Sequence, residues 1–293
     1  MGTRSVVTTL GFLGVGAMGS KIAARLIAAG NSVLVWNRSP GPLADLVAIG
    51  AVPVATPSEA LAADISFSML ANDQAAEEVL NDGTTRTGRI HVNLASISPT
   101  AADQLTGRFA AAGAGYVSSP VLGRPSAAAA GQLHLLAAGA SDHIDAVLPH
   151  LNQIGKRVWR IGQVPSDANA VKVAVNYNLI HVLQALGESV TMVERRGVDP
   201  SVFVELLTSS LFAGVAYTEY GREIAAHRHT PPAFSMALGY KDLGLARDLA
   251  EAGGVKPATM PALFSVFERA LADPELATSD WGAIAEVTRR NLL

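Results

Sequence analysis

Short apolar runs alternate with amphipathic segments along the first half of the chain. The apolar runs, which predict strands, lie at residues 7–13, 32–36, 52–55, 65–70, 89–94, 115–118, 133–138 and 157–161. Segments of helical periodicity lie between several of these runs, at residues 17–29, 57–63, 72–81 and 99–112. Ser58 and Ser98 are the predicted N-caps of the second and fourth helices. This order predicts an α/β fold with a doubly wound, mostly parallel sheet.

The pattern changes near residues 162–166, where glycine, proline and serine gather. A helical pattern without proline then runs from 167 to 196, long enough at about 1.5 Å per residue to span a domain. Further helical segments lie at residues 200–207, 211–226, 237–252, 260–271 and 281–291. We therefore expect a Rossmann-like domain over residues 1–163, a long interdomain helix, and an all-α domain over residues 164–293.

A glycine-rich turn, GVGAMG at residues 14–19, joins the first predicted strand to the first predicted helix. In dinucleotide-binding turns, the first glycine permits the turn, the second admits a pyrophosphate, and the third lets the helix pack on the sheet. The helix N-terminus then directs its N–H groups at the phosphates. The strand–turn–helix–strand context favours this interpretation over a glycine-rich turn of another α/β protein. The expected cofactor contacts are Gly14, Gly16, Ala17, Met18 and Gly19.

The second predicted strand ends in Trp36-Asn37-Arg38-Ser39, without the carboxylate that usually binds the ribose 2′-hydroxyl of NAD. An arginine is always charged and can bind a phosphate through two hydrogen bonds. Asn37 and Ser39 can add further hydrogen bonds. The sequence therefore favours NADP(H) over NAD(H), and the alternative is that Arg38 is only a solvated surface residue.

Composition narrows the function further. The chain has 293 residues, of which 49% are hydrophobic and 16% charged, and its net charge is −3. It contains no cysteine, which excludes disulfides, thiolate catalysis and cysteine-ligated metals. No basic run suggests nucleic acid, and no apolar stretch reaches the length of a membrane span, so we expect a cytoplasmic protein. His227 and His229 form the only histidine pair of metal-like spacing, and a polar loop without metal is expected there.

Ligands of open α/β sheets bind outside the carboxyl ends of the strands. Segments that leave predicted strand ends contain the candidate residues Leu70, Ala71, Ser96, Leu122, Gly123 and Arg124. The long helix adds Lys172 and Asn176, which lie four residues apart and so on one face. Hydride transfer to a carbonyl needs a proton donor for the developing alkoxide, and a lysine can supply it. Taken singly, Lys172 and Asn176 could equally be ordinary surface residues.

Four segments together resemble the β-hydroxyacid dehydrogenases, the family of 3-hydroxyisobutyrate dehydrogenase and the glyoxylate/succinic semialdehyde reductases. These segments are residues 11–19, 118–124, 169–176 and 241–243, and the resemblance covers nearly the whole chain. It implies that Lys172 is the catalytic acid/base and that Asn176 binds the substrate beside it. It also implies that Ser96 and Gly123 line the substrate site, that Lys241 closes the cleft near the nicotinamide, and that two copies form a homodimer.

The chain departs from the family pattern at the substrate segment. Leu122 stands where the family usually has a serine that holds the substrate carboxylate, and Arg124 stands where it has glycine. A hydrogen bond to a charged group contributes roughly 1.5–3 kcal/mol, so Leu122 should weaken binding of small hydroxyacids. An apolar pocket favours a related class, the NADPH-dependent imine reductases, whereas Lys172 argues against it. A non-catalytic NADPH-binding protein is a third interpretation.

Overall fold

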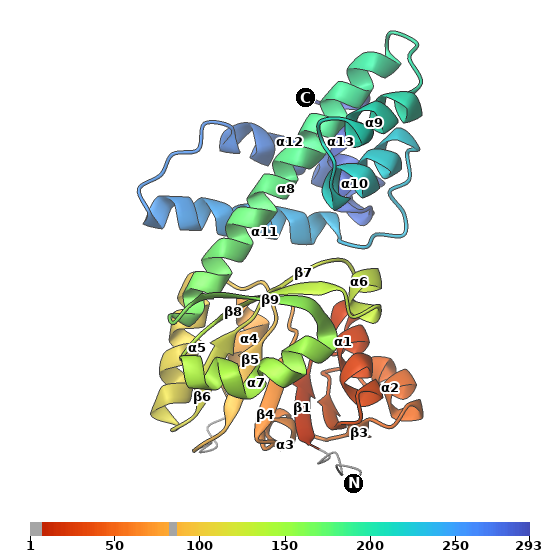
Figure 1. Ribbon diagram of the computed structural model, residues 1–293. Helices are drawn as coiled ribbons and strands as arrows, with labels where there is room; N and C mark the ends of the chain where they lie inside the picture. Colours follow the sequence, from red (N-terminus) through yellow and green to blue (C-terminus); the bar gives the residue numbers. More distant parts are fainter. Residues whose placement is uncertain (1–7, 82–86) are drawn as a thin grey trace. The chain divides into compact units, whose positions relative to one another are not determined.

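The computed structural model describes residues 8–81 and 87–293 (Figure 1). The start of the first predicted strand, at residue 7, lies outside the described residues. Contacts within the chain divide it into two compact units, residues 1–172 and 173–293. The long helix α8 (Pro165–Glu194) begins in the first unit and continues in the second. The division therefore falls inside α8, whereas the sequence pattern places it in the turn before the helix.

The first unit is built on one mixed sheet. Its strands are β1 (Thr9–Leu13), β2 (Ser32–Trp36), β3 (Val52–Pro53), β4 (Ile65–Ser68), β5 (Ile90–Asn93), β6 (Gly115–Ser118), β7 (Val121–Leu122), β8 (Leu133–Ala138) and β9 (Gly155–Gly162). Their order is β3-β2-β1-β4-β5-β6-β8-β7, and β9 also pairs with β8. Strands β1 to β6 are parallel, while β8 runs antiparallel to β6 and β7. The predicted doubly wound α/β sheet is confirmed.

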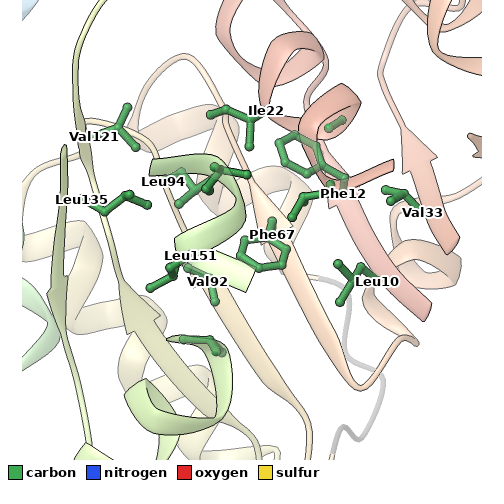
Figure 2. Close-up of a cluster of buried hydrophobic side chains, with 14 of the residues drawn as sticks. Leu10, Phe12, Ile22, Val33, Phe67, Val92, Leu94, Val121, Leu135 and Leu151 are labelled. Atoms are coloured by element: carbon green, nitrogen blue, oxygen red, sulfur yellow. The ribbon is translucent and has the colours of Figure 1, made fainter. Parts of the chain in front are cut away.

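Hydrophobic cores cover both faces of this sheet, which explains why its strands are continuous apolar runs. Figure 2 shows one core, in which Phe12 of β1 and Phe67 of β4 pack with residues that include Ile22 of α1 (Ala17–Ala28). The two phenyl rings stack with their centroids 6.4 Å apart. A second core includes Leu105 and Tyr116, and neighbouring strand residues alternate between the two cores.

Helices connect the strands of the first unit. After α1 come α2 (Ala44–Ala48), α3 (Pro57–Leu61), α4 (Asp73–Leu80), α5 (Pro99–Ala111), α6 (Pro125–Ala129) and α7 (Ser141–Ile154). Ser98 caps α5 as predicted, accepting the Ala101 N–H at 3.0 Å. The prediction that Ser58 caps α3 is wrong. Thr56 accepts the N–H of Glu59 instead, because Pro57 occupies the first helical position.

The second unit is helical, as the sequence predicts. It contains the larger part of α8, then α9 (Pro200–Ser209), α10 (Val215–Ala225), α11 (Met236–Ala252), α12 (Met260–Ala272) and α13 (Ile284–Arg289). The helix expected at 211–226 begins only at Val215, after Gly214 with φ +151°. The helix expected at 281–291 is split into a short 3₁₀ turn, Trp281–Ala283, and α13.

Two tryptophans, Trp159 and Trp281, differ in their surroundings. Trp281 is buried and donates a 2.8 Å hydrogen bond to the Tyr220 hydroxyl. Trp159 is 40% exposed on β9, and its ring packs against the Arg157 guanidinium, which lies 3.5 Å from the ring centre. No helix in the described part of the chain has both the length and the hydropathy to cross a membrane.

Candidate active site

In the glycine-rich turn between β1 and α1, the fold requires glycine at positions 14 and 19 but leaves open space at Gly16. A Cβ atom on Gly14, whose φ is +88°, would lie 2.5 Å from the Met69 carbonyl oxygen. One on Gly19 would lie 1.9 Å from the carbonyl oxygen of Gly14. A Cβ on Gly16 would meet no atom within 4 Å, so the fold itself does not require glycine there.

The turn has the features of a phosphate site. Gly16 is the N-cap of α1 and supplies no side-chain cap, which leaves the first N–H groups of the helix available to an anion. Gly16 and Ala17 are exposed, and Met18 is half-buried. The open space at Gly16 and the uncapped helix end together fit a dinucleotide pyrophosphate.

Asn37 at the end of β2 holds this turn in place. Its Oδ1 accepts the Val15 N–H at 3.1 Å, and its Nδ2 donates to the Ser39 carbonyl at 2.9 Å. Arg38 and Ser39 are exposed beside it. The sequence assigned Asn37 a contact with the cofactor, but its amide is already engaged at both ends within the protein.

The other strand ends carry the predicted contact residues. Leu70 follows β4 and packs beside the turn, with its Cδ2 2.9 Å from the position of a Cβ on Gly14. Ala71, the next residue, is exposed. After β5, Ser96 is half-buried between the buried side chains of Ala95 and Ile97.

The substrate segment contains a two-residue strand that the sequence does not predict. In β7, Leu122 pairs with His134 of β8 and is half-buried against Leu136 and Ala168. Ala168 belongs to the first turn of α8, so Leu122 lies at the start of the helix that carries Lys172. Gly123 has φ +142°, and a Cβ there would lie 2.7 Å from Leu133 Cδ2. Arg124 occupies the N-cap position of α6 and is half-buried.

The helix α8 carries the two predicted catalytic residues. Lys172 is half-buried, and Asn176 is buried one turn further on. The Asn176 Nδ2 donates a 2.5 Å hydrogen bond to Asp242 Oδ2 on α11. The Lys241 Nζ lies 2.9 Å from Asp242 Oδ1. One carboxylate thus binds both Asn176 and Lys241.

Asp242 is the site residue that sequence analysis missed. Its side chain is 2% exposed, whereas that of the neighbouring Lys241 is 26% exposed. A signal was present, because Asp242 stands among the residues that form the buried face of α11, such as Gly239, Leu243 and Ala246. A charge at such a position needs a partner, and here Asn176 and Lys241 supply two.

The histidine pair belongs to a different cluster. The pair lies in the loop between α10 and α11, as expected, but His229 is buried, and its Nε2 lies 3.2 Å from Glu286 Oε1. Burial alone would raise the pKa of Glu286, but His229, Arg289 and His227 outweigh it and hold this pKa below its usual value. Within residues 8–81 and 87–293, no three His, Cys, Asp or Glu side chains are arranged to hold a metal ion.

Comparisons with known proteins identify the family to which the chain belongs. Residues 9–162 match the NAD binding domain of 6-phosphogluconate dehydrogenase. Residues 166–288 match the NAD-binding region of NADP-dependent 3-hydroxyisobutyrate dehydrogenase. The chain is a β-hydroxyacid dehydrogenase family member. It is therefore an NAD(P)-dependent oxidoreductase of the β-hydroxyacid dehydrogenase type, with a small-molecule substrate.

Individual relatives extend over most of the chain. This family member is 33% identical over 279 residues to an uncharacterized oxidoreductase, YfjR, of Bacillus subtilis, covering 93% of this chain and 96% of the relative. It is 31% identical over 249 residues to glyoxylate/succinic semialdehyde reductase 2 of Arabidopsis thaliana, covering 83% and 69% of the two chains.

Solved structures share the fold. A 3-hydroxyisobutyrate dehydrogenase of Salmonella typhimurium superposes with a TM-score of 0.86 at 23% identity, over 96% of this chain and 99% of that one. An imine reductase of a Pseudomonas species gives a TM-score of 0.67 at 21% identity, over 96% and 99%.

Proposed function

We propose that this family member is an NADPH-dependent oxidoreductase that interconverts a small carbonyl compound, such as a semialdehyde, and its hydroxyl form, such as a β-hydroxyacid, with Lys172 as the acid/base. The observation that carries the proposal is the arrangement on α8. Lys172 and Asn176 lie one turn apart, and the Asn176 amide is fixed by the buried Asp242 carboxylate. The similarity to a glyoxylate/succinic semialdehyde reductase supports a carboxylated aldehyde as substrate.

The cofactor contacts divide into three groups. The first group, Gly14, Gly16, Gly19 and the first turn of α1, would hold the pyrophosphate, with Leu70 and Ala71 beside it. Arg38 and Ser39 would bind the 2′-phosphate of NADPH, since both are exposed beside the turn. Lys241 is the remaining proposed cofactor contact. When bound, NADPH supplies the hydride.

The protein's own residues orient the substrate and supply the proton. Lys172 donates a proton to the carbonyl oxygen as negative charge develops there, a role that typically contributes 10²–10⁴-fold. Asn176 binds the substrate beside Lys172, and the hydrogen bond from its Nδ2 to Asp242 fixes the orientation of its amide. Ser96 and Gly123 line the pocket, Leu122 contributes apolar surface, and Arg124 binds a substrate carboxylate.

Preference for NADPH is tested by binding. We expect Arg38→Ala to weaken NADPH binding about tenfold or more, which is about 1.4 kcal/mol, and to leave NADH binding unchanged. Lys21→Ala is the control, because Lys21 is an exposed cation on α1 beyond its first turn. Equal dissociation constants of the wild-type protein for NADPH and NADH would refute the preference.

Imine reduction is the second candidate function, and Leu122 is the observation that favours it. Leu122 packs within an apolar cluster beside the start of α8, which favours an apolar substituent on the substrate. The two functions differ in their need for Lys172. Lys172→Ala should lower the rate of carbonyl reduction at least about 10²-fold, whereas an imine substrate can be protonated before it binds.

The proposed enzyme acts as a homodimer of its helical units. Five large apolar side chains are exposed on α9 and the segment after it: Val202, Leu206, Leu211, Phe212 and Val215. Leu211 is 85% exposed, and clustered apolar exposure of this kind is typical of protein interfaces. Leu206→Glu should convert a dimer into a monomer in sedimentation velocity, whereas Val255→Glu, at an exposed position outside this group, should not.

The substrate class is tested by the loss of NADPH absorbance with a panel of carbonyl and imine compounds. The panel contains glyoxylate, succinic semialdehyde, methylmalonate semialdehyde, an aromatic aldehyde and a cyclic imine. Turnover of a carboxylated aldehyde supports the proposal. Turnover of the imine alone would replace it with imine reduction, and no turnover of any compound would favour a binding protein.

A further inference from the structure

One buried amide on α8 reaches the loop that carries Ser96. Asn169 is 1% exposed, and its Nδ2 donates a 3.3 Å hydrogen bond to the Ile97 carbonyl. Both residues belong to the first unit, although they are far apart in the sequence. A buried polar side chain needs such a partner, because leaving it unpaired costs about 1–3 kcal/mol.

The loop after β5 is held at each end as well. The Ala95 N–H donates to Asn93 Oδ1 at 2.9 Å, and the Ser98 N–H donates to Asp73 Oδ1 at 2.9 Å. The side chains of Ala95 and Ile97 are buried on either side of Ser96. The backbone around Ser96 is therefore fixed at three points, and the Ile97 carbonyl is the one tied to α8.

Asn169 and Lys172 share one face of α8. They are three residues apart, which places them as neighbours on the helix surface. A hydrogen bond from Asn169 to Ile97 therefore fixes the helical turn that carries Lys172, both along the axis of α8 and in rotation about it, relative to the loop that carries Ser96. Displacement of a catalytic group by about 1 Å can cost about 10²-fold in rate.

We propose that Asn169 is a positioning residue that sets the separation between Lys172 and Ser96 by tying α8 to the loop after β5. The inference rests on the proposed function, in which Lys172 gives the proton and Ser96 binds the substrate. Asn169 itself touches neither substrate nor cofactor in this scheme. Its removal should lower kcat more than it raises KM, because the substrate contacts survive while the proton donor shifts.

Hydrogen–deuterium exchange tests the link between Asn169 and the loop after β5 without an activity assay. We expect Asn169→Ala to increase deuterium exchange in peptides that cover residues 94–98 and 165–172. The matched control is Asn178→Ala, also on α8, whose Nδ2 donates only to the Ala174 carbonyl of its own helix. Asn169→Ser, whose hydroxyl falls short of the Ile97 carbonyl, replaces Asn169→Ala if that variant does not fold. Exchange at 94–98 that matches the wild type would overturn the proposal.

The positioning role is tested by a double-mutant cycle with succinic semialdehyde. We expect Asn169→Ala to lower kcat about 10–100-fold in the wild-type background and less than twofold in a Lys172→Ala background. Asn169→Gln, which keeps the amide, should recover part of the lost kcat. Equal losses in both backgrounds would mean a general structural defect and would overturn the proposal. A Lys172→Ala variant with more than a tenth of wild-type kcat would instead overturn the proposed acid/base, so the two failures are distinguishable.

Discussion

Replacement of Asp242 by asparagine is the sharpest test of the site in the helical unit. The substitution keeps the shape of the side chain but removes its charge and one of its two acceptor oxygens. The carboxylate accepts from Asn176 at 2.5 Å and pairs with Lys241 at 2.9 Å, so one of these partners must lose its acceptor. The Lys241 side chain is 26% exposed and can turn to water, whereas Asn176 is buried and cannot.

The loss of stability expected for Asp242→Asn follows from those two contacts. A hydrogen bond to a charged group contributes roughly 1.5–3 kcal/mol to stability, and the hydrogen bond from Asn176 should account for most of the stability lost. For a protein of this size, 1 kcal/mol shifts Tm by about 2–4 °C, so we expect Tm to fall by about 3–12 °C. A released Asn176 amide also loses its orientation toward the substrate, and kcat should fall about 10–100-fold.

Asp248→Asn is a closely matched control, since it is the same substitution on the same helix. Asp248 pairs with the preceding Arg247 at 3.0 Å, as Asp242 pairs with Lys241, but its side chain is 58% exposed. An exposed pair contributes at most about 1 kcal/mol. Differential scanning calorimetry and steady-state kinetics compare the two variants. If Asp242→Asn stays within 1 °C in Tm and twofold in kcat of Asp248→Asn, the argument from burial is wrong.

Three further outcomes are expected. Lys172→Ala should lower kcat at least about 10²-fold while the NADPH dissociation constant stays unchanged; a loss below tenfold would place the proton donor elsewhere. Leu122→Ser should lower KM for succinic semialdehyde by restoring a hydrogen-bond donor, and an unchanged KM would place position 122 outside the pocket. The pKa of Glu286 is lowered by its cationic neighbours, so its stabilising effect is complete above its unfolded pKa of about 4.5 and lost as pH falls through the lower folded value. The Tm of Glu286→Gln should therefore approach that of wild type on acidification below pH 4.5, and a constant difference would contradict this.

Much of the first unit could be predicted from sequence because its strands are buried on both faces. Continuous apolar runs such as Leu10–Leu13 have few alternatives to a parallel strand between two helix layers. The glycine-rich turn could also be predicted, since a side chain at Gly14 or Gly19 would clash with nearby backbone atoms, and a short sequence motif is enough to identify such positions. Strand β7 was missed because two residues carry no periodicity, and α7 was missed because Pro149 interrupts its pattern.

The rest depends on residues that are distant in the chain. The burial of Asp242 follows from its contact with Asn176, which lies 66 positions earlier. The exposure of Trp159 and the burial of His229 likewise depend on which elements pack against them, and composition gives no sign of either. The hydrogen bond from Asn169 to the Ile97 carbonyl has a backbone acceptor. Every residue has a backbone carbonyl, so the sequence cannot indicate which one is bound.

The hydrogen bond between Val15 and Asn37 has an evolutionary consequence. An aspartate at position 37 would lose the hydrogen bond from Nδ2 to the Ser39 carbonyl but keep the oxygen that accepts the Val15 N–H, which holds the turn before α1. It would also place a carboxylate at the end of β2, where NAD-binding proteins carry one for the ribose hydroxyl. Asparagine and aspartate codons differ only in their first base. A lineage that carries this turn can therefore move from one nicotinamide cofactor toward the other by a single point mutation, without first passing through a misfolded ancestor.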